Sequence, residues 1–121
     1  ILFITHSMGV VAEVADEVAV MYAGEVIEQG KVNSIFDKPS HPYTQGLLSS
    51  IPNAKRDIDE NGKRARLKPI EGIVPSLYSN PKGCAFAPRC ELSESRCSNT
   101  ASLIPIQVDH LSRCWKFKVE A

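Results

Sequence analysis

Four cysteines in the second half of the chain are the side chains whose type and spacing best support chemistry. Four thiolates can surround one tetrahedral zinc ion or one iron–sulfur cluster. Zinc ribbons use Cys-x2-Cys pairs, whereas the spacing here is wider and uneven, Cys-x5-Cys-x6-Cys-x16-Cys. Arginines beside three of the four suit a cluster of net negative charge, so the sequence favours an iron–sulfur cluster, with zinc, free thiols and disulfides as alternatives. The cysteines are Cys84, Cys90, Cys97 and Cys114, and the arginines are Arg89, Arg96 and Arg113.

Two histidines are further candidates for a site. His6 follows a continuous apolar run at residues 1–5, which is typical of a strand buried on both faces of a parallel sheet. Ligands of open α/β sheets bind at the carboxyl ends of such strands, so His6 is placed to contact one. The structural alternative for His6 is a partly buried histidine that is hydrogen-bonded to the backbone. His110 stands close to Cys114 in the sequence and could replace a cysteine as a metal ligand.

The elements that must position His6 alternate between strand and helix. Ser7 can cap a helix that starts at Met8 and carries apolar residues at helical spacing. Residues 17–22 are predicted to form a strand, Gly24 turns the chain, and residues 25–29 are predicted to form the next strand. This order is typical of the edge of an α/β domain. Because the chain opens on an apolar run without a methionine, we expect it to start inside that domain.

Two short helices are predicted after the hairpin, one at residues 32–36 and one from His41 to the residue before Pro52. The ring of Tyr43 is expected to pack onto the main domain. Residues 53–68 are rich in charge and poor in large apolar side chains, which predicts a solvated linker. The expected domains are therefore a first unit at residues 1–52, the charged linker at residues 53–68 and a second unit at residues 69–121.

The second unit is predicted to be a small, irregular, cysteine-rich module. Proline and glycine recur at short intervals through residues 69–88 and exclude long regular elements there. Val108 and residues 115–119 are the expected short strands. Such a module has little core of its own and needs a staple, for which the cysteines are suited.

Composition and charge exclude several classes of protein. The 121 residues carry 14 basic and 14 acidic side chains, so no basic surplus indicates a nucleic-acid partner. No apolar run approaches the roughly 20 residues that span a bilayer, and no secretory signal is recognisable. A cytoplasmic location with reduced thiols is therefore expected. The sequence shows no nucleophile–base arrangement and no paired carboxylates that would indicate an enzyme in its own right.

Three segments carry a resemblance to a known family. Residues 4–16, which begin Ile-Thr-His-Ser, resemble the switch-histidine segment of ABC ATPases, and residues 20–30 resemble the hairpin that follows it. Residues 36–48 contain His-Pro-Tyr-Thr, and the tail from Gly72 to Cys97 contains three cysteines. These last two segments are similar to ATP-binding subunits of ABC transporters that import oligopeptides, dipeptides or nickel. The resemblance covers almost the whole chain.

The resemblance implies the C-terminal fragment of an ABC ATPase domain, an α/β fold, followed by the cysteine module. In that family the histidine at the position of His6 hydrogen-bonds the γ-phosphate of ATP and helps to position the attacking water. Ser7 departs from the family, which usually has aspartate there. The 121 residues contain no Gly-x-x-x-x-Gly-Lys-Ser/Thr phosphate loop and no Leu-Ser-Gly-Gly signature. ATP and Mg²⁺ are therefore expected in the intact parent only, and the fragment itself is expected not to be catalytic.

The resemblance also implies a four-iron four-sulfur cluster at the four cysteines, as in some peptide-importer ATPases. It implies as partners a second ATP-binding subunit and the membrane subunits of a transporter, with the parent peripheral on the inner face of the cell membrane. The chain alone is expected to self-associate through the exposed edge of its first strand. The alternative of another class is a free-standing iron–sulfur or zinc-binding module.

Overall fold

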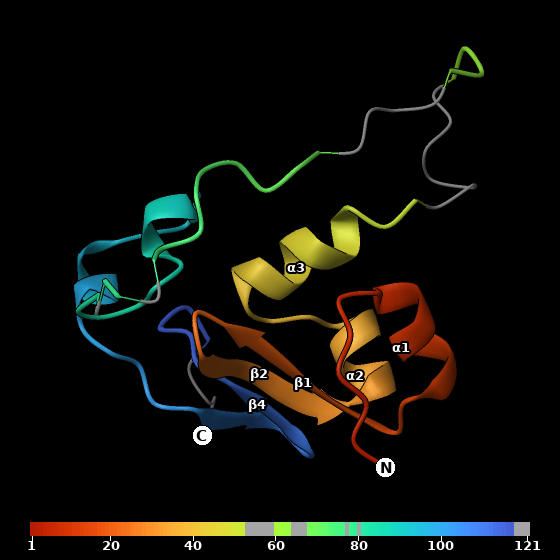
Figure 1. Ribbon diagram of the computed structural model, residues 1–121, viewed down its shortest axis with the longest axis horizontal. Coiled ribbons are helices and arrows are strands. Elements are labelled where there is room, and N and C mark those ends of the chain that lie inside the picture. Colours follow the sequence, from red (N-terminus) through yellow and green to blue (C-terminus); the bar gives the residue numbers. More distant parts are fainter. Residues whose placement is uncertain (53–59, 64–67, 77, 80, 118–121) are drawn as a thin grey trace.

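An antiparallel sheet forms the centre of the protein in a computed structural model that describes residues 1–52, 60–63, 68–76, 78–79 and 81–117 (Figure 1). The four strands in these residues have the order β1-β2-β4-β3. The predicted mixture of helix and strand is confirmed, although every strand pair is antiparallel. The strands are β1 at Glu17–Tyr22, β2 at Glu25–Lys31, β3 at Ile104–Gln107 and β4 at His110–Ser112.

The predicted hairpin of β1 and β2 is confirmed. Every second side chain of β1 is buried, the period of a strand with one face on a core. Ala23 and Gly24 form the turn with φ angles of 48° and 83°, as the common two-residue hairpin turn requires. β2 continues past the predicted end at Gln29, because its last residues pair with β4. The buried side chains of β1 are Val18, Val20 and Tyr22.

The short strands of the second half lie elsewhere than the sequence predicts. Val108 belongs to the turn between β3 and β4, and Trp115 and Lys116 form a turn rather than a strand. Residues 118–119 of that predicted strand lie outside the described residues. Strand β4 forms because it pairs with β2, which is far away in the sequence. The position of the strand is therefore determined by this pairing and not by the local strand preference of Val108 and Trp115.

Three helices accompany the sheet in the described residues: α1 at Met8–Val14, α2 at Val32–Asp37 and α3 at Pro42–Ser49. All three were expected from the sequence. In α3, the Nδ1 atom of His41 accepts a hydrogen bond of 3.1 Å from the N–H of Tyr43 and caps the helix. Ser7 precedes α1, but its hydroxyl makes no capping hydrogen bond. None of these helices combines the length and the apolar character that crossing a bilayer requires.

Residues 1–5 do not form the predicted buried strand. The side chains from Ile1 to Ile4 have exposed fractions between 60% and 126%. A parallel strand is stabilised by neighbouring strands and by cover on both faces. The described sheet is antiparallel and begins with β1, so it offers this segment neither. The apolar composition of residues 1–5 predicts a buried strand, and this prediction is wrong for the described sheet, which does not include the segment.

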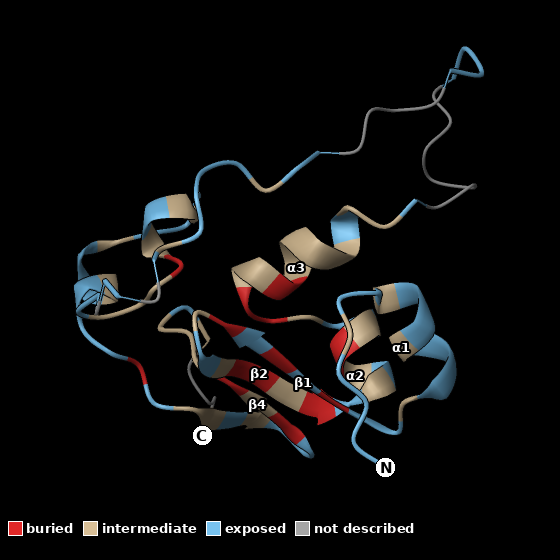
Figure 2. Cartoon of the chain, in the orientation of Figure 1, coloured by how far each residue is buried: buried red, intermediate tan, exposed pale blue. Residues whose placement is uncertain are grey.

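One core joins residues from both sides of the predicted linker. The ring of Phe86 lies 5.3 Å from that of Tyr22 and 5.4 Å from that of Tyr43, between centroids. The ring of Tyr43 also lies 4.7 Å from that of Tyr22, so Tyr43 packs against the hairpin as predicted. Figure 2 shows buried residues gathered on the strands and at the start of α3. Most of the linker predicted at residues 53–68 lies outside the described residues, and the units predicted on either side of it share one sheet and one core.

Candidate functional site

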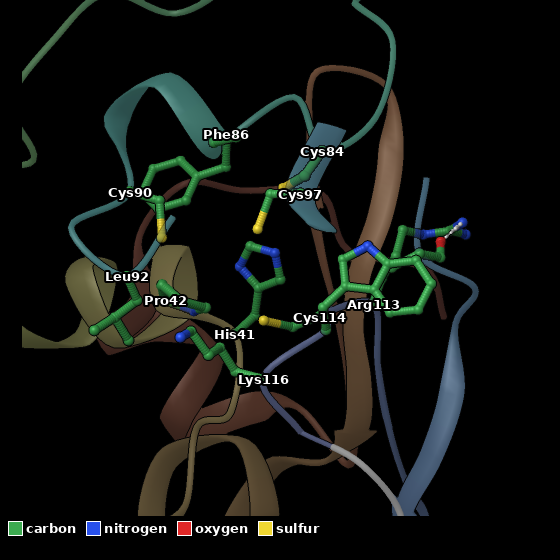
Figure 3. A pocket seen from close by; sticks show the side chains of 13 residues that line it. His41, Pro42, Cys84, Phe86, Cys90, Leu92, Cys97, Arg113, Cys114 and Lys116 are labelled. Atoms are coloured by element: carbon green, nitrogen blue, oxygen red, sulfur yellow. Dashed lines mark hydrogen bonds between the residues drawn. The ribbon is translucent and has the colours of Figure 1, made fainter. Parts of the chain in front are cut away.

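The four cysteines line one cavity (Figure 3). Its volume is about 20 Å³, enough for one water molecule. All four cysteines are free thiols and are partly buried. Figure 3 shows the sulfur atoms of Cys90, Cys97 and Cys114 arranged around the ring of His41. The remaining wall is largely apolar, with Pro42, Phe86, Ala87, Leu92, Ala101 and Trp115, and includes the cations Arg113 and Lys116.

Short turns and one sheet strand place the cysteines. The 3₁₀ helix η1 (Ala87–Arg89) lies between Cys84 and Cys90, and the 3₁₀ helix η2 (Ser95–Ser98) contains the third cysteine. Cys114 follows β4, which is fixed by its pairing with β2. In Figure 1 the residues around η1 and η2 lie at one end of the sheet, and α1 and α2 lie at the other. The pairing of β4 with β2 therefore places Cys114 near the other three cysteines.

Gly83 allows the segments that carry the first and third cysteines to approach each other. The N–H of Cys84 donates a hydrogen bond of 2.9 Å to the carbonyl oxygen of Cys97. Gly83 has a φ angle of 83°, which residues with a Cβ rarely adopt. A Cβ atom at this position would lie 2.5 Å from the carbonyl oxygens of Cys97 and Ser98. Glycine is therefore required both for the backbone conformation and for space.

Gly83→Ala is expected to lower the free energy of unfolding by about 3 kcal/mol, of which about 1 comes from the positive φ and about 2 from the clash. Gly24→Ala is the matched control, because Gly24 has the same φ of 83° but has no other atom within 4 Å of an added Cβ. The control should lose about 1 kcal/mol. Urea unfolding measures both variants, and equal losses would contradict a role for the close approach.

Burial raises the pKa of the thiols of Cys84, Cys90 and Cys114, and the neighbouring cysteines add to the rise. The ammonium group of Lys116 opposes the rise at Cys90. Without a metal, these thiols are therefore protonated at neutral pH. Metals bind the thiolate, so loading the site would release protons and would depend on pH.

Of the three arginines that the sequence places beside cysteines, Arg113 lines the cavity and the other two do not. Arg89 donates instead to two backbone carbonyls and to a tyrosine hydroxyl. The guanidinium of Arg96 pairs with Glu94 at 2.6 Å. Lys116 also lines the cavity, and the sequence reasoning missed it. The charged groups of both are engaged elsewhere, however, because the guanidinium of Arg113 donates to the carbonyl oxygens of Val26 and Ala101 and the ammonium of Lys116 pairs with Glu94.

The donor set fits a metal centre in its chemistry, but the side chains are not drawn together. In the described parts of the chain, no three His, Cys, Asp or Glu side chains are close enough to one another to hold a metal ion. A cavity of about 20 Å³ also has no room for a four-iron cluster. Binding a metal or a cluster would therefore require the cysteine-bearing segments to rearrange.

His41 is a member of the cavity wall that the sequence analysis treated only as the start of a helix. Its side chain is 1% exposed, and its ring centroid lies 5.9 Å from that of Phe86. Burial lowers the pKa of His41 to about 4, so the imidazole is neutral at neutral pH. No sequence signal was available for this position, because a histidine at a helix start has common structural roles.

A buried carboxylate next to the cavity was also missed. Glu28 of β2 is fully buried and accepts hydrogen bonds from the N–H and the hydroxyl of Ser40 at 2.7 and 2.9 Å, and from the N–H of His41 at 2.9 Å. Its Oε1 atom lies 2.6 Å from Nε2 of His110. Burial opposes ionisation of Glu28, but hydrogen bonding to its carboxylate outweighs burial and lowers its pKa below the ordinary value.

The two histidines singled out from the sequence lie away from the thiols. His110 is buried against Glu28 and does not line the cysteine cavity, so it is not placed as an alternative metal ligand. His6 is exposed in the segment before α1. In Figure 1 that N-terminal segment runs beside α1, at the end of the sheet away from the cysteines. The phosphate-binding role of His6 stays a prediction.

The family described as the oligopeptide/dipeptide transporter, C-terminal region, matches residues 27–97. This match covers more than half of the chain, and the chain belongs to that family. The matched residues include most of β2, all of α2 and α3, and three of the four cysteines.

Relatives in several bacteria are similar over nearly the whole chain. A protein of Brucella ovis named as a peptide import ATP-binding protein is 43% identical over 118 residues, 97% of this chain and 35% of its own length. A protein of Sinorhizobium fredii named as a peptide ABC transporter ATP-binding protein is 42% identical over 117 residues, 96% of this chain and 33% of its own length. The chain thus spans about a third of the length of these relatives.

Proposed function

We propose that the chain is the C-terminal part of the ATP-binding subunit of an ABC importer of oligopeptides or dipeptides. The observation that carries this proposal is the similarity over 97% of the chain to a protein named for peptide import and ATP binding. In the complete subunit, ATP and Mg²⁺ are held by a phosphate loop outside these 121 residues, which contain none. The chain by itself therefore does not hydrolyse ATP.

His6 is the residue through which the chain takes part in hydrolysis. A neutral or protonated imidazole can hydrogen-bond a γ-phosphate, and such a bond to a charged group contributes about 1.5–3 kcal/mol. The exposed position of His6 leaves its side chain free to meet a nucleotide held by other residues. The partners in this proposal are a second ATP-binding subunit and the membrane subunits, which place the complex at the inner face of the cell membrane.

A hybrid protein tests the proposal. The C-terminal part of the Brucella ovis relative is replaced by the matching 118 residues of this chain, and ATP hydrolysis and uptake of a labelled oligopeptide are measured. The hybrid should support both, and its His6→Ala variant should hydrolyse ATP at least tenfold more slowly, as the loss of one charged hydrogen bond implies.

The matched control for the hybrid is Ser7→Asp, which introduces the residue usual in the family beside an intact His6 and should leave hydrolysis unchanged. A folded hybrid that supports neither hydrolysis nor uptake would contradict the assignment to a peptide importer. ATP turnover by the purified 121-residue chain alone would contradict the view that it is not catalytic.

The four cysteines are proposed to hold a four-iron four-sulfur cluster, with zinc as the alternative. The supports are the four free thiols on one cavity and the largely apolar remainder of its wall. When bound, such a centre cross-links the cysteine-bearing segments, which otherwise contribute Phe86 and Ala101 to the buried residues. In this proposal the cysteines have a structural role, because the bound centre holds their segments together. They would have the same role in the alternative proposal, in which the chain is a free-standing metal-binding module.

A further inference from the structure

The segments that carry Cys84 and Cys97 touch each other through their backbones. The N–H of Cys84 donates a hydrogen bond of 2.9 Å to the carbonyl oxygen of Cys97. Residues joined in this way across two neighbouring segments have Cα atoms about 5.5 Å apart. The Cα atoms of a disulfide are usually about 4.4–6.8 Å apart. The backbones of Cys84 and Cys97 are therefore at a separation that a disulfide bridges.

The side chains of this pair also share one space. Both thiols line the cavity, and both are free and partly buried. Figure 3 shows Cys84 and Cys97 next to each other in its wall. A disulfide needs two thiols and adds no atom between them, so a cavity of about 20 Å³ is large enough. It also does not need the three close ligands that the described residues fail to supply.

The other two cysteines have no such backbone contact with a cysteine-bearing segment. The N–H of Cys90 donates to Ala87, and the carbonyl oxygens of Cys90 and Cys114 accept from residues three positions later in the chain. All of these hydrogen bonds are local. In the described residues, Cys84 and Cys97 are thus the pair of cysteines whose backbones the fold ties together.

We propose that Cys84 and Cys97 are a site of reversible oxidation, which form a disulfide when the metal-free chain meets a small disulfide such as glutathione disulfide. One protein thiolate attacks a sulfur atom of the oxidant, and one glutathione thiolate leaves. The second cysteine then attacks the protein sulfur of this mixed disulfide, and the second glutathione leaves. The protein loses two electrons and two protons, and these convert glutathione disulfide into two glutathione molecules.

The bond would close a loop at residues 84–97 and fix a part of the core. This loop carries Phe86, whose ring packs against the rings of Tyr22 and Tyr43. Closing a loop of this length restricts the unfolded chain, so the equilibrium constant for unfolding should fall about a hundredfold. The inference goes beyond the proposed function, because it requires neither a transporter nor a metal centre.

The sequence allows the disulfide to be mapped directly. Trypsin cleaves after Lys82, Arg89, Arg96 and Arg113, so each cysteine lies in a peptide of its own. The whole chain, kept metal-free by a chelator, is equilibrated without air in glutathione buffers of rising disulfide content. Free thiols are then alkylated, and the digest is analysed by mass spectrometry without reduction. Because the reading is taken at equilibrium, slow attack by partly buried thiols does not affect it.

Peptides 83–89 and 97–113 should become linked at a lower disulfide content than any other pair. A different internal pair that forms first, links between two chains, or glutathione adducts without an internal disulfide would overturn the inference. This reading is independent of iron uptake and of the hybrid transporter, so failure of either proposal above leaves it unchanged.

Two double variants with the same number of thiols test the pair further. Cys90→Ser with Cys114→Ser keeps Cys84 and Cys97, and its oxidised form should show the hundredfold smaller unfolding constant in urea relative to its reduced form. Cys84→Ser with Cys114→Ser is the matched control and should stay reduced in the same buffer. Equal oxidation of the two variants would contradict the pairing. If a variant does not fold, the peptide map of the unsubstituted chain decides.

Discussion

Glu28→Gln is expected to lower the free energy of unfolding by about 4 kcal/mol, because it removes the fully buried charge on which Ser40, His41 and His110 converge. A carboxylate has acceptor sites for all of these donors. Glutamine offers one oxygen, and its NH₂ group would face donors that have no other partner. Since whole domains are stable by about 5–15 kcal/mol, this one substitution should bring the chain close to unfolding.

Urea unfolding of Glu28→Gln measures the effect, with Glu17→Gln as the matched control. Glu17 is an exposed glutamate on the neighbouring strand β1, so its substitution should change stability by less than about 0.5 kcal/mol. A variant that reaches no folded baseline in water agrees with the prediction. A loss below about 1 kcal/mol would show that the convergence of hydrogen bonds on Glu28 contributes little.

Comparing the free energy of unfolding of the unsubstituted chain and of Glu28→Gln at several pH values isolates the contribution of the Glu28 charge. The folded pKa of Glu28 lies below its ordinary value of 4.5. Its contribution to stability is therefore complete above about pH 4.5 and is lost as the pH falls below that value toward the folded pKa. Between pH 5 and pH 3 the unsubstituted chain should thus lose more stability than Glu28→Gln, which has no carboxyl group to protonate at this position.

The elements that depend on local sequence could be predicted. The hairpin turn at Ala23 and Gly24 needs two positive φ angles, and the short β1 and β2 strands alternate in burial. Helix α3 starts with a proline in its first turn and ends before Pro52. Each of these features is determined by residues within a few positions of one another, so the sequence pattern is sufficient.

The elements that depend on distant partners could not be predicted. Strand β4 has three residues, His110–Ser112, and no pattern of its own; it exists through its pairing with β2. Residues 1–5 have the pattern of a buried strand but no such pairing in this sheet. Local composition thus indicates that a segment prefers burial, and it does not indicate which strand will cover it.

The residues of the candidate site likewise fall into those that the sequence could predict and those that it could not. The four cysteines were found from their type and spacing, and the structure brings them to one cavity. Glu28 and His41 were missed, because a glutamate in a strand and a histidine at a helix start each have common structural roles. Their relation to the cavity arises from the contact of β2 with the segment before α3, which are linked only in three dimensions. Whether the thiols bind iron or zinc stays a prediction.

Replacing all four cysteines by serine should abolish a metal centre that the unsubstituted chain acquires. After anaerobic reconstitution, the unsubstituted chain is expected to bind about four iron and about four sulfide ions and to absorb visible light, whereas the serine variant should bind none. His6→Ala is the matched control, because His6 does not line the cavity and its loss should leave the iron content unchanged. A folded, colourless and metal-free chain would contradict the cluster, and one zinc ion per chain would support the alternative centre.

Loading should also change the protein around the thiols, since the metal-free cavity of about 20 Å³ admits only a water molecule. The chain has a single tryptophan, Trp115, and its side chain lines this cavity. Its fluorescence should therefore fall as the cluster forms, and the fall should be absent in the serine variant. Because binding to the folded state alone adds to stability, the loaded chain should also unfold at a higher urea concentration than the metal-free chain. Iron uptake without either change would place the metal outside the cysteine cavity.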